Sequence, residues 1–312
     1  MMTAVYFSYD YELLWGVWDG TGEGYARRNV AAANEVAGRL VGLHKKHDIP
    51  ATFAIVGAML SGKTPLEIMA GTGRSSQDLQ RFETTFMPRV TGKDMVQVKA
   101  ETLDELAQNP LFEVASHTHT HFYALKASDE LIEREFKAFN DMLKRKTGQE
   151  AVSLVMPKNQ MTAAVLVVAA KHGFKVVRMN PDSWLYRPVN RAGWAAKLIR
   201  ILRFADTFIP LLELFVDRSR HVNEISNVKV NKGPYFVRPL LRFGIMNWLH
   251  RQRLKVGFYY CALRKIDCHF WSHPHNFGAG PDAAMENFEK LLIWLKRKEA
   301  KGQIAFKLMK DT

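Results

Sequence analysis

The segment FEVASHTHTH, residues 112–121, decides what kind of fold this chain adopts. Its first half, 112–116, predicts a short buried strand, and three histidines follow at positions 117, 119 and 121. A helix start at Ser128 comes soon afterwards. In parallel α/β folds, functional side chains gather where strands end, at the carboxyl edge of the sheet. The segment therefore indicates one strand of a parallel sheet with polar residues at its functional edge.

The alternation of strand and helix continues on both sides of this segment, which is typical of an α/β chain with a parallel sheet. Two stretches, about 61–107 and 181–255, interrupt it, and we interpret both as insertions into a single domain spanning residues 1–312. Seven strands interleaved with helices suggest a barrel or a broad parallel sheet. The predicted strands are 4–10, 49–56, 112–116, 152–156, 175–179, 266–273 and 304–309, and the predicted helices are 25–47, 128–146, 161–172 and 281–298.

Two further polar clusters follow predicted strands. Asp10 and Glu12 close the first strand, and residues two apart on an extended chain point the same way, so both can face one pocket. The segment HFWSHPHN, residues 269–276, closes a late strand. A carboxylate with two imidazoles is a common ligand set for a catalytic Zn²⁺ or similar divalent ion that keeps one position open for water. The clusters together indicate a metal-dependent active site.

Composition narrows the functional classes. The 312 residues are 47% apolar and 24% charged, which excludes a disordered chain. Cys261 and Cys268 are too few for a disulfide scaffold, so we expect two core thiols in a reducing compartment. The start lacks a basic n-region, and no run of 18 uncharged apolar residues occurs, so we expect neither a secretory signal nor a membrane span. The net charge of +13 favours an anionic partner without choosing between nucleic acid, phosphorylated substrate and anionic lipid.

Four motifs make the chain resemble the polysaccharide deacetylases of carbohydrate esterase family four, which contain the NodB-homology domain. FSYDYE (7–12) is similar to the family's strand ending in paired acids, and DIPATFAIVG (48–57) to the strand motif that follows it. His117 and His121 match the His-Ser/Thr-x-x-His metal motif, and His273 with the following proline matches the late His-Pro motif. The resemblance implies an α/β fold, a distorted (β/α)7 barrel of the polysaccharide deacetylase type with the two insertions.

A narrower likeness concerns the substrate. The segment MPKNQ (156–160) stands where much of the family has Arg-Pro-Pro-Tyr, and it resembles a branch found among O-antigen and other surface-polysaccharide biosynthesis proteins. LLWG (13–16) and HPHNF (273–277) resemble the same branch. This likeness implies removal of an N-acetyl group from a nucleotide- or lipid-linked sugar in surface polysaccharide or lipopolysaccharide biosynthesis. A formyl group in place of acetyl, and the identity of the sugar, stay open.

The family motifs imply a role for each residue that matches them. Glu12, His117 and His121 are expected to hold one divalent ion, Zn²⁺ by preference and Co²⁺, Ni²⁺ or Fe²⁺ as alternatives. Asp10 is expected to act as general base on a metal-activated water. His273 is expected to protonate the departing amine as general acid.

Three other residues have less settled expectations. His275 is the rival of His273 for the acid role. Lys158 takes the place of the family's arginine and is expected to orient Asp10, although it lacks the bidentate fork of a guanidinium. His119 points away from its neighbours if the segment is extended, so we expect it in packing or behind the metal ligands.

A second enzyme class enters through GAMLSGKT, residues 57–64, which fits the P-loop pattern G-x-x-x-x-G-K-[ST] after a predicted strand. Met59 and Leu60 are bulky where such a loop wraps phosphate with bare backbone. Pro65 removes a backbone N–H where donors are needed. Nucleotide hydrolysis is therefore the minor alternative.

A third hypothesis is a deacetylase-like module without catalysis that binds an anionic membrane surface or a polysaccharide. In segment 194–216, Lys197, Arg200 and Arg203 occupy one helical side and apolar residues the other, as in helices that lie in an anionic interface. We favour the simpler interpretation, a helix packed on the barrel with a solvated basic face. Membrane contact suits a cytoplasmic protein at the inner membrane face. Dispersed basic residues without interleaved aromatic ones argue against nucleic acid.

Overall fold

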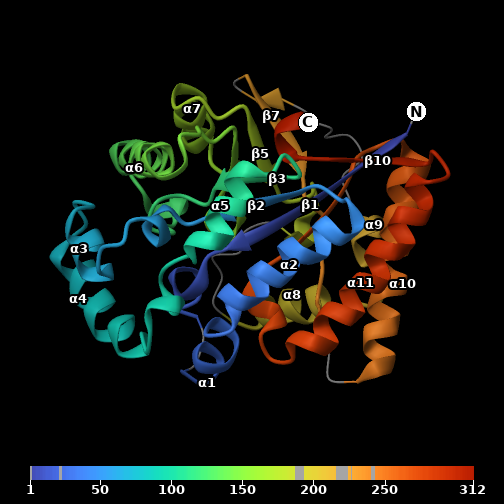
Figure 1. Cartoon of the computed structure of the whole chain (residues 1–312), viewed down its shortest axis with the longest axis horizontal. Helices are drawn as coiled ribbons and strands as arrows, with labels where there is room; N and C mark the ends of the chain where they lie inside the picture. Colours follow the sequence, from blue (N-terminus) through green and yellow to red (C-terminus); the bar gives the residue numbers. More distant parts are fainter. Residues whose placement is uncertain (1, 21–22, 187–192, 216–223, 226, 240–242) are drawn as a thin grey trace.

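The computed structural model describes residues 2–20, 23–186, 193–215, 224–225, 227–239 and 243–312. Its strands form one central sheet, and helices cover the outside (Figure 1). The strands are β1 (Thr3–Tyr11), β2 (Ala51–Ile55), β3 (Phe112–Ser116), β4 (Ser153–Val155), β5 (Val176–Met179), β6 (Glu224–Ile225), β7 (Val228–Lys232), β8 (Tyr235–Phe236), β9 (Cys268–Ser272) and β10 (Ile304–Lys307). The helices are α1 (Glu23–Tyr25), α2 (Ala33–His47), α3 (Pro65–Ala70), α4 (Ser76–Thr85), α5 (Ala100–Gln108), α6 (Asp129–Thr147), α7 (Ala163–Lys171), α8 (Trp194–Ala205), α9 (Leu211–Phe215), α10 (Gly244–Arg264) and α11 (Pro281–Glu299).

The strand order is β6-β7-β5-β4-β3-β2-β1-β9-β8, with β10 attached to β1. The pairs are parallel except for β6 with β7 at the edge. All nine residues of β1 are buried, as expected for a central parallel strand with both faces covered. The carboxyl ends of β1, β2, β3 and β9 therefore meet at one edge of the sheet.

One bent stretch of chain brings the two ends of the sheet together. β7 pairs with β5 at one end of the strand order, and β8 pairs with β9 at the other. The two strands are separated by Gly233 and Pro234 alone. A Cβ on Gly233 would lie 3.0 Å from the Arg178 side chain, so a larger residue at the bend would press on that arginine. The ring is β1, β2, β3, β4, β5, β7–β8 and β9, which confirms the predicted distorted seven-stranded barrel.

The structure corrects which segments supply the seven strands. Segment 304–309 forms β10, which pairs with β1 outside the ring. The remaining ring position is filled by residues 228–236, inside the stretch 181–255 that the sequence pattern suggests is an insertion. These short strands lack a strong apolar pattern, and they become strands because the free edges of β5 and β9 offer them backbone partners.

Segment 61–107 lies more peripherally. Its helices α3 and α4 are at one edge of the molecule, away from the sheet, whereas α5 contacts β3 and α2 (Figure 1). The helix predicted over 25–47 is interrupted, because a π-helical turn, Ala26–Val30, precedes α2. This turn places the Asn29 amide where it donates to the backbone oxygen of His275 at 3.1 Å.

Candidate active site

The three polar clusters predicted from the sequence meet at one edge of the barrel. β1 brings Asp10 and leads directly into Glu12, β3 leads into the histidine segment 117–121, and β9 leads into 273–275. β9 and β2 flank β1, and β3 is the next strand beyond β2. Parallel pairing thus collects side chains that lie more than a hundred positions apart in the sequence.

Glu12, His117 and His121 form a compact buried group. Glu12 Oε2 lies 3.2 Å from His117 Nε2 and 3.0 Å from His121 Nε2. The other ring nitrogen of His117, Nδ1, bonds to the backbone oxygen of Val155 at 2.8 Å, which turns Nε2 toward Glu12. Ligand atoms around a tetrahedral ion with bonds of about 2.0–2.1 Å are spaced about 3.3 Å apart. The donor types and their spacing therefore fit a divalent metal ion.

Electrostatics keep both carboxylates of the site ionised. Burial raises the pKa of Glu12, but the facing imidazoles outweigh it and hold that pKa well below its usual value. Burial likewise raises the pKa of Asp10, yet the charge of Arg178 brings it below the ordinary value. Burial lowers the pKa of His117, and the bond to Glu12 more than compensates, so this pKa is raised.

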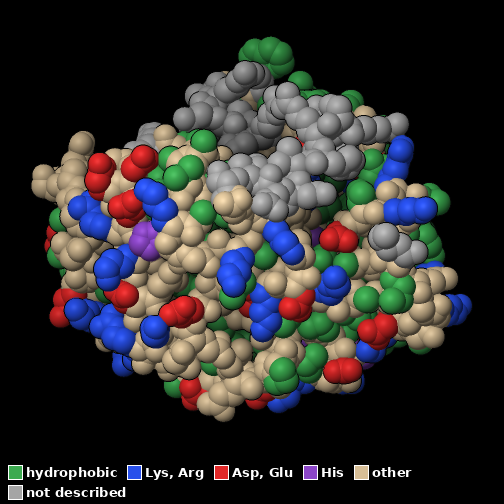
Figure 2. All heavy atoms as spheres, turned by 90° about the horizontal axis from the view of Figure 1, so that it is seen from above, with side chains coloured by type: hydrophobic (Ala, Val, Ile, Leu, Met, Phe, Trp, Pro, Cys, Tyr) green, Lys and Arg blue, Asp and Glu red, His purple; other side chains and the backbone are tan. Residues whose placement is uncertain are grey.

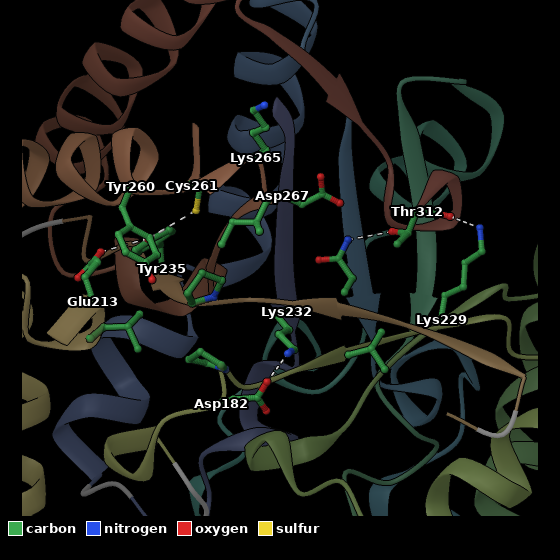
Figure 3. Close-up of a pocket in the computed structure, with 16 residues that line it drawn as sticks. Asp182, Glu213, Lys229, Lys232, Tyr235, Tyr260, Cys261, Lys265, Asp267 and Thr312 are labelled. Carbon is green, nitrogen blue, oxygen red and sulfur yellow. Dashed lines mark hydrogen bonds and ion pairs between the residues drawn. The ribbon is translucent and has the colours of Figure 1, made fainter. Parts of the chain in front are cut away.

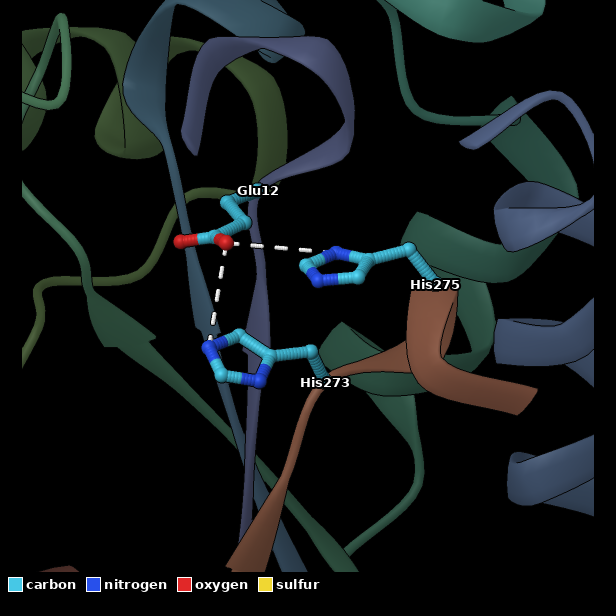
Figure 4. A group of neighbouring side chains, drawn as sticks. All are labelled: Glu12, His273 and His275. Atoms are coloured by element: carbon cyan, nitrogen blue, oxygen red, sulfur yellow. Dashed lines mark ion pairs between the residues drawn. The ribbon is translucent and has the colours of Figure 1, made fainter. Parts of the chain in front are cut away.

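A second group shares Glu12. His273 Nε2 lies 3.7 Å and His275 Nδ1 3.9 Å from Glu12 Oε1, with the two rings stacked at 4.8 Å (Figure 4). His273 is 20% exposed, and its Nδ1 bonds to Asn276 Oδ1 at 3.0 Å. Burial lowers the pKa of His275 to about 3, and Nδ1 of this ring has no hydrogen-bond partner among the residues that the structure describes. These distances are longer than those in the group with His117 and His121, so the latter fits a metal better.

Asp10 is held by a buried arginine that sequence reasoning did not assign to it. The two Nη atoms of Arg178, on β5, donate to the two carboxylate oxygens of Asp10 at 2.6 and 2.7 Å. Arg178 Nη1 also donates to Ser8 Oγ at 2.9 Å. This planar fork fixes the orientation of the carboxylate as well as its charge.

The expected contact between Lys158 and Asp10 is not made. Lys158 Nζ lies 3.4 Å from Asp19 Oδ2 and 3.9 Å from the centre of the Tyr123 ring. Its side chain is 47% exposed, whereas the Asp10 carboxylate is buried and already paired with Arg178. The motif position alone suggested the wrong cation, since nothing local to β5 marks Arg178 as its replacement.

Two supporting residues also escaped sequence reasoning. Glu135, buried on α6, accepts from the backbone N–H of His119 at 2.9 Å and of Thr120 at 2.7 Å, so it holds the loop that carries the histidines. A Cβ on Gly16 would overlap the Glu12 carboxylate, so only glycine leaves room for that ligand. An acid seven residues into a helix and a glycine after a strand are too common to be recognised as signals.

The P-loop pattern at 57–64 does not form a phosphate cradle. The backbone N–H groups of Gly57 and Ala58 donate to the carbonyl oxygens of Thr118 and His119 at 2.9 and 2.7 Å. These amides thus support the histidine loop and are not turned toward a ligand. A Cβ on Gly57 would lie 2.8 Å from His119 Nδ1, so His119 packs against Gly57, apart from the ligand group.

Helix α8 presents apolar side chains to solvent, and this corrects the interpretation of it as a packed helix with only its basic face exposed. Ile201 is 63% and Leu198 46% exposed. The end of α8 is tied to α10, because His250 Nδ1 bonds to the Thr207 oxygen at 2.9 Å. We define the α8–α10 apolar surface as six exposed apolar side chains, four from α8 and two from the first turns of α10: Trp194, Leu198, Ile201, Phe204, Ile245 and Trp248. Residue 216 of the predicted segment lies outside the described residues.

A cavity of about 450 Å³ lies beside β7, α10 and the C-terminus (Figure 3). None of the predicted site residues lines it. Several of its charged side chains are engaged with other groups: Lys232 bonds to Asp182, Lys229 Nζ to the Thr312 oxygen at 2.5 Å, and Glu213 to Arg253. The cavity therefore offers no converging reactive groups.

On the face that Figure 2 shows, Lys and Arg side chains are interspersed with Asp and Glu and form no single basic patch. In the described part of the chain, no helix combines the length and the apolar character that crossing a bilayer requires.

The sequence matches the family model "Polysaccharide deacetylase" over residues 23–177, about half of the chain. The match includes His117 and His121, whereas Asp10, Glu12 and His273 lie outside it. A search of curated proteins finds no match.

Solved structures resemble this one over almost its whole length. A Mycobacterium smegmatis protein classed as a polysaccharide deacetylase aligns over 98% of this chain and 93% of its own, with a TM-score of 0.52 and 12% identity. A family 4 carbohydrate esterase from Bacillus anthracis aligns over 99% and 82%, with a TM-score of 0.45 and 13% identity. A CE4 family pseudoenzyme from Bacillus anthracis aligns over 99% of this chain and 65% of its own, with a TM-score of 0.47 and 13% identity. The chain thus spans just under two thirds of the length of that pseudoenzyme. The likeness to the Mycobacterium smegmatis protein shows a shared fold.

Proposed function

Because this chain belongs to the polysaccharide deacetylase family, we propose that it is a metal-dependent hydrolase that removes an N-acetyl group from a sugar. One observation carries the proposal: the possible metal ligands Glu12, His117 and His121 lie in the same site as Asp10, whose carboxylate is held by Arg178. Burying two carboxylates among imidazoles costs free energy, and such arrangements are characteristic of catalytic sites.

Glu12, His117 and His121 would hold the ion, with Zn²⁺ preferred and Co²⁺, Ni²⁺ or Fe²⁺ as alternatives. When bound, a divalent ion polarises a carbonyl and lowers the pKa of water toward about 7. The bond from His117 Nδ1 to Val155 fixes the tautomer that keeps Nε2 available as a ligand.

Asp10 takes the proton of the attacking water. Arg178 holds both carboxylate oxygens in one plane, which keeps Asp10 ionised and oriented before substrate arrives. Asp10 Oδ2 also faces His273 Nε2 at 3.7 Å, so the base and the acid stand on either side of the same small space.

His273 delivers a proton to the departing amine. Its Nδ1 is engaged by Asn276, which leaves Nε2 directed at the two carboxylates, and its partial exposure lets substrate reach it. His275 stacks against it and is almost fully buried, and its backbone oxygen accepts a hydrogen bond from the Asn29 amide. We therefore assign the acid role to His273 and packing to His275.

The substrate is a nucleotide- or lipid-linked N-acetylated sugar of surface polysaccharide or lipopolysaccharide biosynthesis, with N-formyl as the alternative. The likeness of segments 13–16, 156–160 and 273–277 to that branch supports this assignment. The α8–α10 apolar surface, with Lys197 and Arg200 exposed on the same helix, supports contact of a cytoplasmic enzyme with the anionic inner membrane face.

Metal content and acetate release, measured on the same preparation, test the proposal. The wild type is expected to hold close to one divalent ion per chain and to release acetate from N-acetylated sugar nucleotides or lipid-linked sugars. The double variant His117→Ala/His121→Ala is expected to lose both properties. His172→Ala, which changes a histidine at the end of α7, is expected to keep both.

A second double variant separates the two histidine groups around Glu12. His273→Ala/His275→Ala is expected to retain the metal and to lose acetate release, because it removes the general acid His273 and the ring of His275 that packs against it. Loss of metal in this variant, with metal retained in His117→Ala/His121→Ala, would show that Glu12, His273 and His275 are the ligands instead. A wild type that holds metal and deacetylates no N-acetylated sugar would contradict catalysis and favour the binding-module hypothesis.

A further inference from the structure

A cavity of about 230 Å³ adjoins the candidate active site. Trp271 and Asn159 line it, and both contact Arg178, the partner of Asp10. The Arg178 guanidinium lies 4.5 Å from the centre of the Trp271 ring, and its Nη2 donates to Asn159 Oδ1 at 3.3 Å. The Trp271 ring is also 5.5 Å from that of His273. A group bound in this cavity is therefore one side chain away from both the base and the acid.

The cavity wall carries an excess of positive charge. Arg253 is neutralised, because its guanidinium bonds to Asp206 at 3.0 Å and to Glu213 at 2.8 Å. Asp206 is the single acidic side chain among the described residues of the wall, so the wall holds more cationic than acidic side chains. The cationic side chains of the wall are Lys158, Arg203, Arg238 and Arg253.

Arg238 is the cation best placed to receive a ligand. Its Nε donates to Thr207 Oγ1 at 3.0 Å, and its guanidinium lies 5.6 and 5.3 Å from the ring centres of Phe204 and Phe236. No ion pair or Nη hydrogen bond of Arg238 occurs in the described part of the chain. Burial lowers its pKa, which reflects the cost of desolvating the cation. Such a cost is offset when an anion binds.

The backbone beside the cavity is strained in a way that builds its wall. Lys158 and Asn159 have φ values of 52° and 51°, in the left-handed region that non-glycine residues rarely adopt. Strain of this kind clusters at functional sites. Here it puts the Asn159 amide on Arg178 and a lysine amine at the edge of the cavity.

We propose that this cavity binds a phosphate group carried by the sugar substrate, an inference that rests on the proposed deacetylase function. The Nη ends of Arg238 suit two oxygens of one group. Lys158, which also lies 3.4 Å from Asp19 Oδ2, places a second cation at the edge of the cavity, and two cations suit a phosphate better than a carboxylate. The cavity is smaller than the roughly 300–1,000 Å³ that enclose whole ligands, so it takes one group of a larger molecule. Trp271 and Phe236 offer aromatic faces to the sugar next to it.

Calorimetric titration with inorganic phosphate and pyrophosphate, in buffers of equal ionic strength, tests binding without any turnover. We expect Arg238→Gln to weaken binding at least tenfold and Arg238→Lys to restore part of it. Arg200→Gln, which removes an exposed charge of α8, is expected to bind as the wild type does. Glu12→Gln is also expected to keep binding, because it perturbs the metal group alone. Absence of binding to the wild type, or loss in Glu12→Gln but not in Arg238→Gln, would overturn the proposal.

Kinetics with three substrates tests the link to the reaction. Acetate release is measured from N-acetylglucosamine, its 1-phosphate and N-acetylglucosaminuronic acid. We expect the phosphate to lower KM at least tenfold relative to the neutral sugar, and Arg238→Gln to remove that advantage. A preference for the uronic acid, or none for either anion, contradicts the phosphate assignment. If no sugar is deacetylated while Arg238-dependent phosphate binding persists, the proposed function fails and the anion site stands.

Discussion

Glu12 illustrates how much of this site depends on single residues that touch no substrate. Its carboxylate faces two imidazoles on one side and the bare backbone of Gly16 on the other. Asp10 depends in the same way on the fork of Arg178. Both acids stay ionised although they are buried, because imidazoles face Glu12 and a guanidinium faces Asp10. A methyl group at position 16 or loss of the Arg178 cation would disrupt these contacts.

Gly16→Ala is expected to deplete the metal without unfolding the protein. The added Cβ overlaps the Glu12 carboxylate, so the side chain must turn away from His117 and His121. We expect metal content to fall at least tenfold on dialysis against micromolar Zn²⁺, measured by atomic emission.

Gly42→Ala is the matched control. A Cβ there meets nothing, and position 42 lies within α2, so we expect full metal content and a gain of about 0.5–1 kcal/mol in stability. Unchanged metal content in Gly16→Ala would show that Glu12 is not a ligand.

At the scale of elements, short strands position the reactive side chains, helix α6 holds the histidine loop, and helix α8 exposes apolar side chains. Glu135 on α6 binds two backbone amides of the histidine loop, so that helix fixes the ligands although it contributes none of them. Helix α8 does the opposite, since it leaves large apolar side chains in solvent next to exposed Lys197 and Arg200. Exposed apolar residues grouped in this manner are characteristic of interaction surfaces.

Co-sedimentation with lipid vesicles tests whether that surface meets a membrane. We expect the protein to pellet with vesicles of phosphatidylglycerol and phosphatidylcholine but not with phosphatidylcholine alone, since attraction requires both apolar burial and charge. Ile201→Asp is expected to weaken this binding at least fivefold. Leu263→Asp, at an even more exposed apolar position near the far end of α10, is expected to leave it unchanged. Equal binding by both variants, or none by the wild type at low salt, would rule out this surface as the membrane contact.

The molecule as a whole is a ring of parallel strands closed by one bent segment, with buried polar groups well beyond the active site. His44 bonds to Tyr9 at 2.7 Å and to the Ile49 oxygen at 2.9 Å, and it ties α2 to β1. His250 bonds to the Thr207 oxygen and to the backbone N–H of Arg238. Burial lowers the pKa of each of these two histidines to about 4. Folding therefore competes with their protonation.

Stability is expected to fall as the pH drops from about 6.5 toward 4. In that window the unfolded chain binds protons at His44 and His250 while the native chain does not, so acid favours unfolding. Each histidine contributes a loss of about 2 kcal/mol between pH 7 and pH 5. Urea unfolding at the two pH values measures it. His44→Gln, which cannot take up this proton, is expected to show a pH dependence smaller by about 2 kcal/mol. An identical dependence in the variant would mean that His44 is not neutral in the fold.

The sequence by itself determined where the reactive side chains cluster. These side chains lie at or within five residues of the end of a strand, and parallel strands bring their carboxyl ends together: Asp10, Glu12, His117, His121 and His273. The strand boundaries followed from local apolar runs in the same way, and 112–116 was predicted to the residue.

Only the tertiary structure decided which residues support those side chains. Arg178 and Asp10 are 168 positions apart, and they meet because β5 and β1 face each other inside one ring, a relation no local pattern records. Residues 228–236 became ring strands because the free edges of β5 and β9 needed backbone partners there. A local sequence pattern indicates which element a segment can form by itself. The partner of a buried charge, or of a strand edge without a neighbour, depends on how the whole chain folds into the ring.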